Sequence, residues 1–207
     1  DFDFTLGALR NNYGIKNADY GAGAISAIYR YGLTNWLTLS MHTEDRQGLT
    51  NGGVGSDIAI GALGTLSLSA STSKGDGQGD QYSAGYSYYG NIWGINYQHI
   101  QRSENFANLS SYRSTVTLSR QSDQATLSLS PWGKILGSFS LGYFDIQAQD
   151  DSRTRLMNLS WSRSLWRNSS FNISINRDLQ ANTYSSMMQI TIPFDGFGSL
   201  QLSSQRA

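Results

Sequence analysis

The stretch that decides the fold is YRYGLTNWLTLSM, residues 29–41. Large apolar side chains occupy every second position on both sides of its central Leu33-Thr34-Asn35. A period of two is the signature of a strand, because successive side chains point to opposite faces. Gly32 and Asn35 suit a tight reversal of the backbone. The stretch therefore predicts a β-hairpin with one apolar face, rich in aromatic residues near the turn, and one polar face.

The same alternation recurs through most of the 207 residues. It predicts roughly fourteen strands, joined consecutively by turns of alternately short and long size, and no helix. The fold class we expect is all-β, an antiparallel up-and-down transmembrane β-barrel segment of about 13–14 strands. The expected strands are 2–8, 25–31, 37–42, 54–61, 66–71, 82–88, 93–97, 116–118, 127–129, 139–143, 157–162, 171–176, 188–194 and 200–202. Polar loops are expected at 11–19, 44–53, 74–80 and 102–110, with turns at 121–124, 131–133, 166–168 and 195–196.

Composition favours a membrane barrel over a soluble sandwich or barrel. Charged residues make up 14% of the chain, whereas about a quarter is usual in soluble domains. The formal net charge is zero, which gives no electrostatic case for nucleic acid as a partner. Ser, Thr, Asn and Gln fill the polar positions instead, and these residues suit a water-filled lumen because they hydrogen-bond without burying an ion.

Aromatic residues beside the expected turns support the same interpretation, since Tyr and Trp gather at membrane interfaces. There is no run of 18 apolar residues, so a transmembrane helix is not expected. The chain starts directly in an alternating strand, which favours an internal piece of a longer protein. The aromatic residues assigned to these interfacial girdles are Tyr31, Trp36, Tyr88, Tyr89, Trp132 and Trp166.

No motif points to covalent chemistry. The two histidines, His42 and His99, have no Cys, Asp or Glu at metal-ligand spacing. No serine lies in a Gly-x-Ser-x-Gly elbow, although residues assembled across strands could still form a hydrolase. The Gly75–Asp80 run occurs once, and a flexible loop explains it better than a calcium turn. We therefore expect no catalytic residue, no metal site and no cofactor.

The alternation assigns candidate residues to two surfaces. Arginines are expected to face away from the aliphatic stripes, because a charge facing mid-bilayer lipid costs about 2–4 kcal/mol. Some of them are expected to pair with Asp57 and Asp145 inside the barrel. Asp150 and Asp151 either pair with Arg153 and Arg155 or are solvated. The candidate pore wall is Arg30, Thr38, Ser40, Arg113, Arg163 and Arg177, and Arg120 is expected to face the same way. The candidate lipid-facing residues are Leu37, Leu39, Met41, Leu159, Ile173, Ile175, Ile190 and Ile192.

Four short motifs, in this order, resemble fimbrial outer-membrane ushers. The stretch from Tyr31 to Leu39 looks like the hairpin typical of that family. It is followed by the Gly61–Gly64 turn before a Ser-rich strand, and by Gly77-Gln78-Gly79 before a Tyr-rich strand. Met188–Phe194, with its Ile-Pro-Phe ending, is similar to a late usher strand. Residues 1–207 would then be the part of the translocation barrel that follows the plug, without the plug or the N-terminal and C-terminal periplasmic domains.

The resemblance implies a bacterial outer-membrane pore of the chaperone–usher pathway, which secretes and assembles pilus subunits during fimbrium biogenesis. Its partners would be outer-membrane lipid and, through the full-length protein, periplasmic chaperone–pilin complexes. Subunits would exchange by strand addition rather than by covalent chemistry, so the protein would not be an enzyme. Two alternatives remain open, a stand-alone porin or small-solute transporter barrel and a secreted β-rich adhesin.

Overall fold

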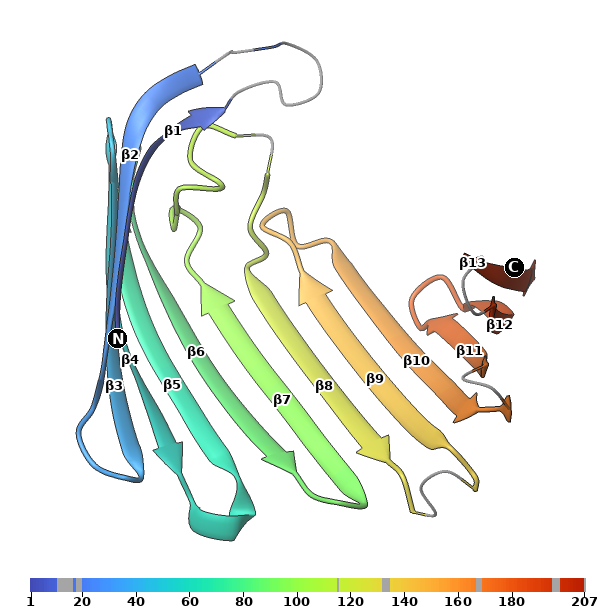
Figure 1. The fold of residues 1–207 in the computed structure, drawn as a ribbon. Helices are drawn as coiled ribbons and strands as arrows, with labels where there is room; N and C mark the ends of the chain where they lie inside the picture. Colours follow the sequence, from blue (N-terminus) through green and yellow to red (C-terminus); the bar gives the residue numbers. More distant parts are fainter. Residues whose placement is uncertain are drawn as a thin grey trace. The chain divides into compact units, whose positions relative to one another are not determined.

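The computed structural model describes residues 1–10, 17, 20–114, 116–131, 135–166, 169–194 and 198–206. Thirteen strands form one antiparallel up-and-down sheet, in which neighbouring strands follow sequence order (Figure 1). The predicted all-β class, the antiparallel topology and the approximate strand number are therefore confirmed. The strands are β1 Phe2–Arg10, β2 Tyr20–Gly32, β3 Leu37–Arg46, β4 Leu49–Ala59, β5 Thr65–Lys74, β6 Gln78–Tyr89, β7 Trp93–Arg102, β8 Gln121–Leu129, β9 Ser138–Gln147, β10 Arg153–Ser164, β11 Ser170–Asp178, β12 Thr183–Phe194 and β13 Gly198–Arg206.

The chain divides into two compact units, which we describe separately. The first unit comprises Asp1–Gly85, His99–Gln121 and Ala148–Asp151, and so contains β1–β5 and most of β6. The second comprises Tyr86–Gln98, Ser122–Gln147 and Ser152–Ala207, and so contains β9–β13 and most of β8. Strands β6, β7 and β8 contribute residues to both, β8 only Gln121 to the first.

The β2–β3 hairpin contains the stretch that decided the sequence prediction. Tyr31 pairs with Leu39, and Tyr29 pairs with Met41. The Thr34 hydroxyl accepts hydrogen bonds from the backbone N–H groups of Trp36 and Leu37, at 3.3 and 3.0 Å. A threonine side chain that bonds to the following backbone is a common way to close a turn. The hairpin is confirmed. The side-chain hydrogen bonds that stabilise its turn come from Thr34, whereas the sequence had pointed to Gly32 and Asn35.

Two of the expected long loops are tight turns. The loop predicted at 44–53 is wrong, because β3 extends to Arg46 and β4 starts at Leu49, with the reversal at Gly48. Gly48 has a φ of +85°, a conformation that glycine adopts without steric cost. The loop predicted at 74–80 is also shorter, since β5 ends at Lys74 and β6 begins at Gln78. Polar strand ends at Glu44, Asp45 and Gln78 had the appearance of loop sequence.

The strand predicted at 116–118 and the turn predicted at 121–124 are both wrong. Residues 103–120 form one long connection between β7 and β8, and Gln121 begins β8. We call this connection the β7–β8 loop; residue 115 lies outside the described residues. The short Gly61–Leu63 turn is confirmed as a 3₁₀ helix, η1. The other predicted loops and turns lie wholly or partly outside the described residues. The positions concerned are most of 11–19, Trp132 and Gly133, 167–168, and 195–196.

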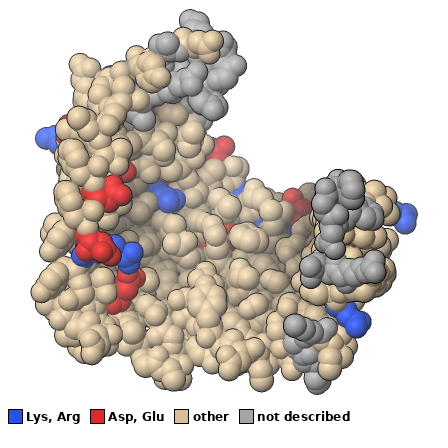
Figure 2. All heavy atoms as spheres, in the orientation of Figure 1, with Lys and Arg blue, Asp and Glu red and all other residues tan. Residues whose placement is uncertain are grey.

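Few hydrophobic side chains are buried in the described part of the chain. Leu49, Phe106 and Tyr112 are among them, at 1%, 6% and 4% exposure. By contrast, Met41 is 54% exposed, Val54 61% and Leu159 49%. Exposed apolar surface on this scale marks contact with a membrane or another protein rather than an ordinary soluble fold. Figure 2 shows that charged groups cover little of the face that it presents. No described helix has the length and apolar character needed to cross a membrane.

Candidate functional site

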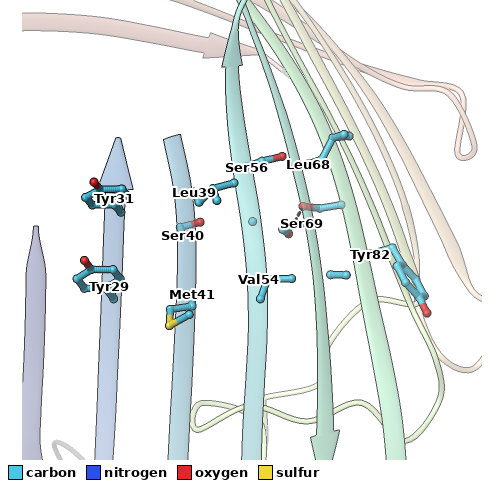
Figure 3. Close-up of a pocket in the computed structure, with 13 residues that line it drawn as sticks. Tyr29, Tyr31, Leu39, Ser40, Met41, Val54, Ser56, Leu68, Ser69 and Tyr82 are labelled. Carbon is cyan, nitrogen blue, oxygen red and sulfur yellow. Dashed lines mark hydrogen bonds between the residues drawn. The ribbon is translucent and has the colours of Figure 1, made fainter. Parts of the chain in front are cut away.

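The apolar face of the first unit is a continuous surface across β2–β6. One row of paired residues runs from Tyr31 through Leu39 and Ser56 to Leu68. The next row contains Tyr29, Met41, Val54 and Ala70. Figure 3 shows these side chains around a shallow groove of about 690 Å³, with Tyr82 of β6 on its far side. The candidate lipid-facing residues Leu37, Leu39 and Met41 therefore do share one face; that this face meets lipid stays a prediction.

The second unit carries an equivalent apolar face. Leu159 pairs with Ile175, and Ile173 lies between Trp161 and Met188. Ile190 pairs with Phe171 on one side and Leu202 on the other, while Ile192 pairs with Leu200. All five lipid-facing candidates of this unit consequently lie on a single face. They are Leu159, Ile173, Ile175, Ile190 and Ile192.

An aromatic cluster borders this apolar face near the β10–β11 connection. The ring of Trp161 lies 6.4 Å from that of Phe139 and 5.7 Å from that of Phe171, between ring centres. The Trp161 indole N–H donates to the Leu136 carbonyl at 2.7 Å. An amphipathic ring that is apolar at one end and hydrogen-bonded at the other is typical of a membrane interface. Tyr31, Trp36, Tyr88, Tyr89 and Trp166 also lie at or beside strand ends, and Trp132 lies outside the described residues.

The polar face of the first unit contains the candidate pore-wall residues of β2 and β3. Arg30 pairs with Ser40, and Thr38 pairs with Asp57, so that all four side chains share this face. The Arg30 guanidinium donates to the Asp57 carboxylate at 2.8 Å, which confirms the predicted pairing. The side chains of β4 and β5 on this face are small, with Gly53 opposite Ser71 and Gly55 opposite Ser69.

The β7–β8 loop packs against the polar face near the β3–β4 turn. The Leu109 backbone N–H donates to the Glu44 carboxylate at 3.0 Å, and the Ala107 N–H donates to the Ser73 hydroxyl at 2.9 Å. Phe106 is 6% exposed and lies close to Gly79 of β6. The loop therefore covers polar strand ends with both hydrogen bonds and apolar contacts, and Asn51 and Ser73 are buried beneath it.

Tyr112 is the main anchor of the β7–β8 loop. Its hydroxyl donates to Asp76 at 3.1 Å, and its carbonyl accepts from Arg46 at 3.1 Å. The guanidinium groups of Arg46 and Arg113 lie 5.9 and 5.0 Å from the ring centre, within the range of cation–π attraction. Burial raises the pKa of the Tyr112 hydroxyl, and the hydrogen bond to Asp76 adds to the effect. Sequence reasoning missed this residue, because nothing local marks it as buried.

The candidate arginines occupy three different environments. Arg113 lies in the β7–β8 loop and pairs with Asp76 at 3.2 Å, rather than lying on a strand. Arg163 pairs across the strands with Phe171, and Arg177 pairs with Met157. Both therefore lie on the apolar face, and the prediction that they face away from the aliphatic stripes is wrong. Counting every second residue from Leu159 leads to Arg163, and from Ile173 to Arg177, so the sequence alone already placed both arginines on the apolar face. The prediction relied on their charge instead.

Asp145 is paired with arginine as predicted, but with different arginines. The prediction that it faces the inside of the barrel is wrong, because Asp145 lies opposite Arg155 on the same face as Leu141 and Leu159. Asp145 is 7% exposed and accepts two hydrogen bonds from Arg153, at 2.6 and 2.7 Å. Arg155 and the Tyr143 hydroxyl donate to it as well, at 3.2 and 3.1 Å. Asp151, which sequence proximity suggested for Arg153 and Arg155, pairs with Arg120 at 3.0 Å.

The described residues contain no group of three or more His, Cys, Asp or Glu side chains placed to hold a metal ion. Each unit carries a largely apolar sheet face, and in the first unit the opposite face consists mainly of small polar residues. Such a sheet can separate lipid from water and can line a passage for a large solute.

No family model matches the sequence, and no curated protein matches it either. Solved structures do match. The structure of the P pilus usher (PapC) translocation pore is similar over 100% of this chain, with a TM-score of 0.66 and 17% identity. A chain of the E. coli P pilus tip assembly intermediate PapC-PapD-PapK-PapG is similar over 100% of this chain, with a TM-score of 0.77 and 19% identity. Pseudomonas aeruginosa OpdO is similar over 99% of this chain, with a TM-score of 0.56 and 13% identity.

The fold of the chain is thus similar to that of the PapC translocation pore and, less closely, to that of OpdO. The chain spans 45% and 28% of the lengths of the two usher-containing matches, and 69% of OpdO. The similarity in fold therefore extends over the whole of this chain and over only part of each usher-containing match.

Proposed function

We propose that this chain is a segment of the outer-membrane pore of a fimbrial usher, which secretes and assembles pilus subunits delivered by periplasmic chaperones. The observation that carries the proposal is the likeness of the whole chain to the PapC translocation pore, at TM-scores of 0.66 and 0.77. The order of the four usher-like motifs in the sequence supports it as well.

The two faces of the sheet give the segment its role in the pore wall. The apolar face is broadly exposed and bordered by aromatic residues, which is the composition that a lipid-facing band requires. Leu39, Met41 and Leu159 belong to that band. The polar face, with Arg30, Thr38 and Ser40, lines the lumen. The β7–β8 loop packs against the lumenal face, where it narrows the passage.

The partners follow from the proposed role. The neighbour PapC-PapD-PapK-PapG is an assembly intermediate of the P pilus tip. By analogy, this protein would receive complexes of a chaperone and a pilus subunit and pass the subunits to the cell surface. Strand addition between subunits supplies the free energy, so the pore wall needs only to be wide, hydrated and weakly adhesive. Residues 1–207 form barrel wall, and we assign the plug and the periplasmic domains to other parts of the protein.

Deletion and complementation of the gene test the proposal. We expect the deletion to abolish surface pili, counted by electron microscopy, while pilus subunits accumulate in the periplasm. The intact gene should restore pili, and a gene lacking the codons for β9–β13 should not. Surface pili that persist in the deletion strain would refute the role.

A stand-alone porin is the second candidate, because OpdO, a porin, also matches the fold. It has the lower TM-score, 0.56, and the lower identity, 13%. A porin predicts that the deletion leaves pili intact and lowers the uptake of a small solute.

A further inference from the structure

Three arginines and one aspartate form a cluster on the apolar face of the second unit, where β9, β10 and β11 approach their connecting loops. Arg155 pairs directly with Asp145, and Arg153 precedes it by two residues on the same face. Arg177 pairs with Met157, the next residue of that face along β10. We call Arg153, Arg155, Arg177 and Asp145 the arginine cluster. Its formal charge, three positive groups and one negative, is +2.

The buried aspartate engages one arginine fully and the other only in part. Arg153 uses both Nε and Nη2 on Asp145, so that these two groups form a bidentate pair. Arg155 reaches the same carboxylate through Nε at 3.2 Å, and no further hydrogen bond of its guanidinium to a described residue is present. The Arg155 side chain is 43% exposed. Its two terminal nitrogens are therefore available as donors.

Arg177 is held by contacts that leave its charge uncompensated. Its guanidinium lies 4.9 Å from the ring centre of Tyr184 and donates through Nη2 to Asn182 at 3.1 Å. Its Nε is buried and has no hydrogen-bond partner among the described residues. Arg155 and Arg177 are diagonal neighbours on adjacent strands, a relation that separates residues by about 7–8 Å. Asp123 accepts a hydrogen bond from the Tyr97 hydroxyl and acts electrostatically on Arg153.

Beyond Arg155 the same face continues with apolar side chains of β9 and β10. Met157 and Tyr143 lie in the row of Arg177, and Leu159, Leu141 and Ile175 form the row after it. A ligand that fits both parts has anionic oxygens at one end and aliphatic chains at the other. Arginine matches phosphate oxygens well, because its planar fork donates two parallel hydrogen bonds.

We propose that Arg155 and Arg177 bind the phosphate of a membrane lipid headgroup, whose acyl chains lie along the apolar face beside Leu141, Met157 and Leu159. Arg153 and Asp145 are positioning residues that fix Arg155. The proposal rests on the proposed function, because it requires the apolar face to meet lipid. The site is a specific lipid site on the outside of the barrel, separate from the passage for subunits.

Native mass spectrometry of the full-length protein, purified in detergent, tests the site. The probe is lipid A carrying two phosphates, titrated against the wild type and against R155Q/R177Q. We expect the double variant to bind lipid A about tenfold more weakly or worse, since two charge-assisted contacts are lost. R155K/R177K should retain much of the affinity. R30Q on the polar face and R163Q at the other end of the apolar face should bind as the wild type does. Heat-modifiable migration on gels verifies that each variant is folded.

The ligand source is distinguished in the same experiment. Fully dephosphorylated lipid A should bind at least tenfold more weakly than the phosphorylated form, and low-millimolar inorganic phosphate should not displace the latter. Equal binding by R155Q/R177Q and the wild type, equal binding of the dephosphorylated lipid, or displacement by inorganic phosphate overturns the inference. Surface pili are counted in parallel. Loss of lipid binding with pili retained supports the lipid site alone, whereas pili that form without this gene refute the usher role whatever the lipid result.

Discussion

Replacing Tyr112 with alanine should release the β7–β8 loop from the polar face. Tyr112 is 4% exposed, and truncation of a buried aromatic side chain costs about 3–5 kcal/mol. The change removes the hydrogen bond to Asp76 and both cation–π contacts. Phe106, Ala107 and Leu109 keep their own contacts, so we use the lower limit of about 3 kcal/mol for the loss in docking free energy.

Trypsin measures this loss, because Arg113 follows Tyr112 in the loop. When loop opening is fast compared with cleavage, the cleavage rate follows the population of the open form. A loss of about 3 kcal/mol then raises cleavage after Arg113 roughly a hundredfold, at about 1.4 kcal/mol for each factor of ten. Tyr112→Phe removes only the hydroxyl, worth about 1 kcal/mol, and should raise cleavage roughly fivefold.

Tyr89→Ala is the matched control, since Tyr89 is 78% exposed and has no part in the loop. Its cleavage rate should equal that of the wild type. Two results would show that the loop is not anchored as described. One is cleavage of Tyr112→Ala within a factor of about three of the wild-type rate. The other is cleavage of Tyr89→Ala as fast as that of Tyr112→Ala. In planar bilayers, the released loop should also raise the conductance of the pore.

Three further predictions concern the sheet. Leu159→Arg should lower barrel stability in lipid by about 2–4 kcal/mol, whereas Ser160→Arg on the opposite face should change it by less than about 1 kcal/mol. Unfolding by urea in vesicles measures both changes. Equal effects of the two substitutions would contradict the lipid-facing assignment of Leu159. Gly79→Ala should displace the β7–β8 loop, because the added Cβ would overlap the backbone of Asn105 and Phe106. Faster tryptic cleavage after Arg113 would show the displacement. Gly7→Ala is the control, since the Cβ added there meets nothing within 4 Å. Asp145→Asn should destabilise the protein more than Asp57→Asn, because the Asp145 side chain is 9% exposed with two arginine partners and that of Asp57 is 33% exposed with one. The expected losses in free energy of unfolding are about 1–3 kcal/mol for Asp145→Asn and less than about 1 kcal/mol for Asp57→Asn. The reverse order, measured by unfolding in detergent, would contradict the assigned burial.

The strand pattern was predictable from sequence wherever large apolar residues alternate with Ser, Thr or Asn. The residues 157–162 and 171–176 are of this kind, and both lie in strands with the expected faces. Prediction failed at polar strand ends, because Glu44–Arg46 and Leu49–Gly53 have few apolar residues to mark the period. Their strand conformation is fixed by pairing with each other and with their neighbours β2 and β5, which local sequence does not reveal.

The contacts of the β7–β8 loop were not predictable for a related reason. Val116 and Leu118 alternate like strand residues, yet the loop is fixed by distant partners. Tyr112 binds Asp76, and Leu109 binds Glu44, 65 positions earlier in the chain. The charged pairs show the same limit. Arg30 and Asp57 were predictable as a pair because both fall on one polar face, whereas Arg177 was misassigned because its charge was given more weight than its parity.

If the chain lines an usher pore as proposed, the Gly and Ser residues of β4 and β5 affect how fast a folded subunit could move along it. Side chains as short as those of Gly53, Gly55, Ser69 and Ser71 leave few projections for a passing surface to catch. The Ser69 hydroxyl is already hydrogen-bonded to that of Ser83 at 2.6 Å, and Ser71 is only 8% exposed, so neither hydroxyl holds a passing surface firmly. Resting positions along such a wall differ little in free energy, so friction is low and drift in either direction is equally easy. In the proposed usher pore, the direction of export would therefore come from events at the two ends of the passage.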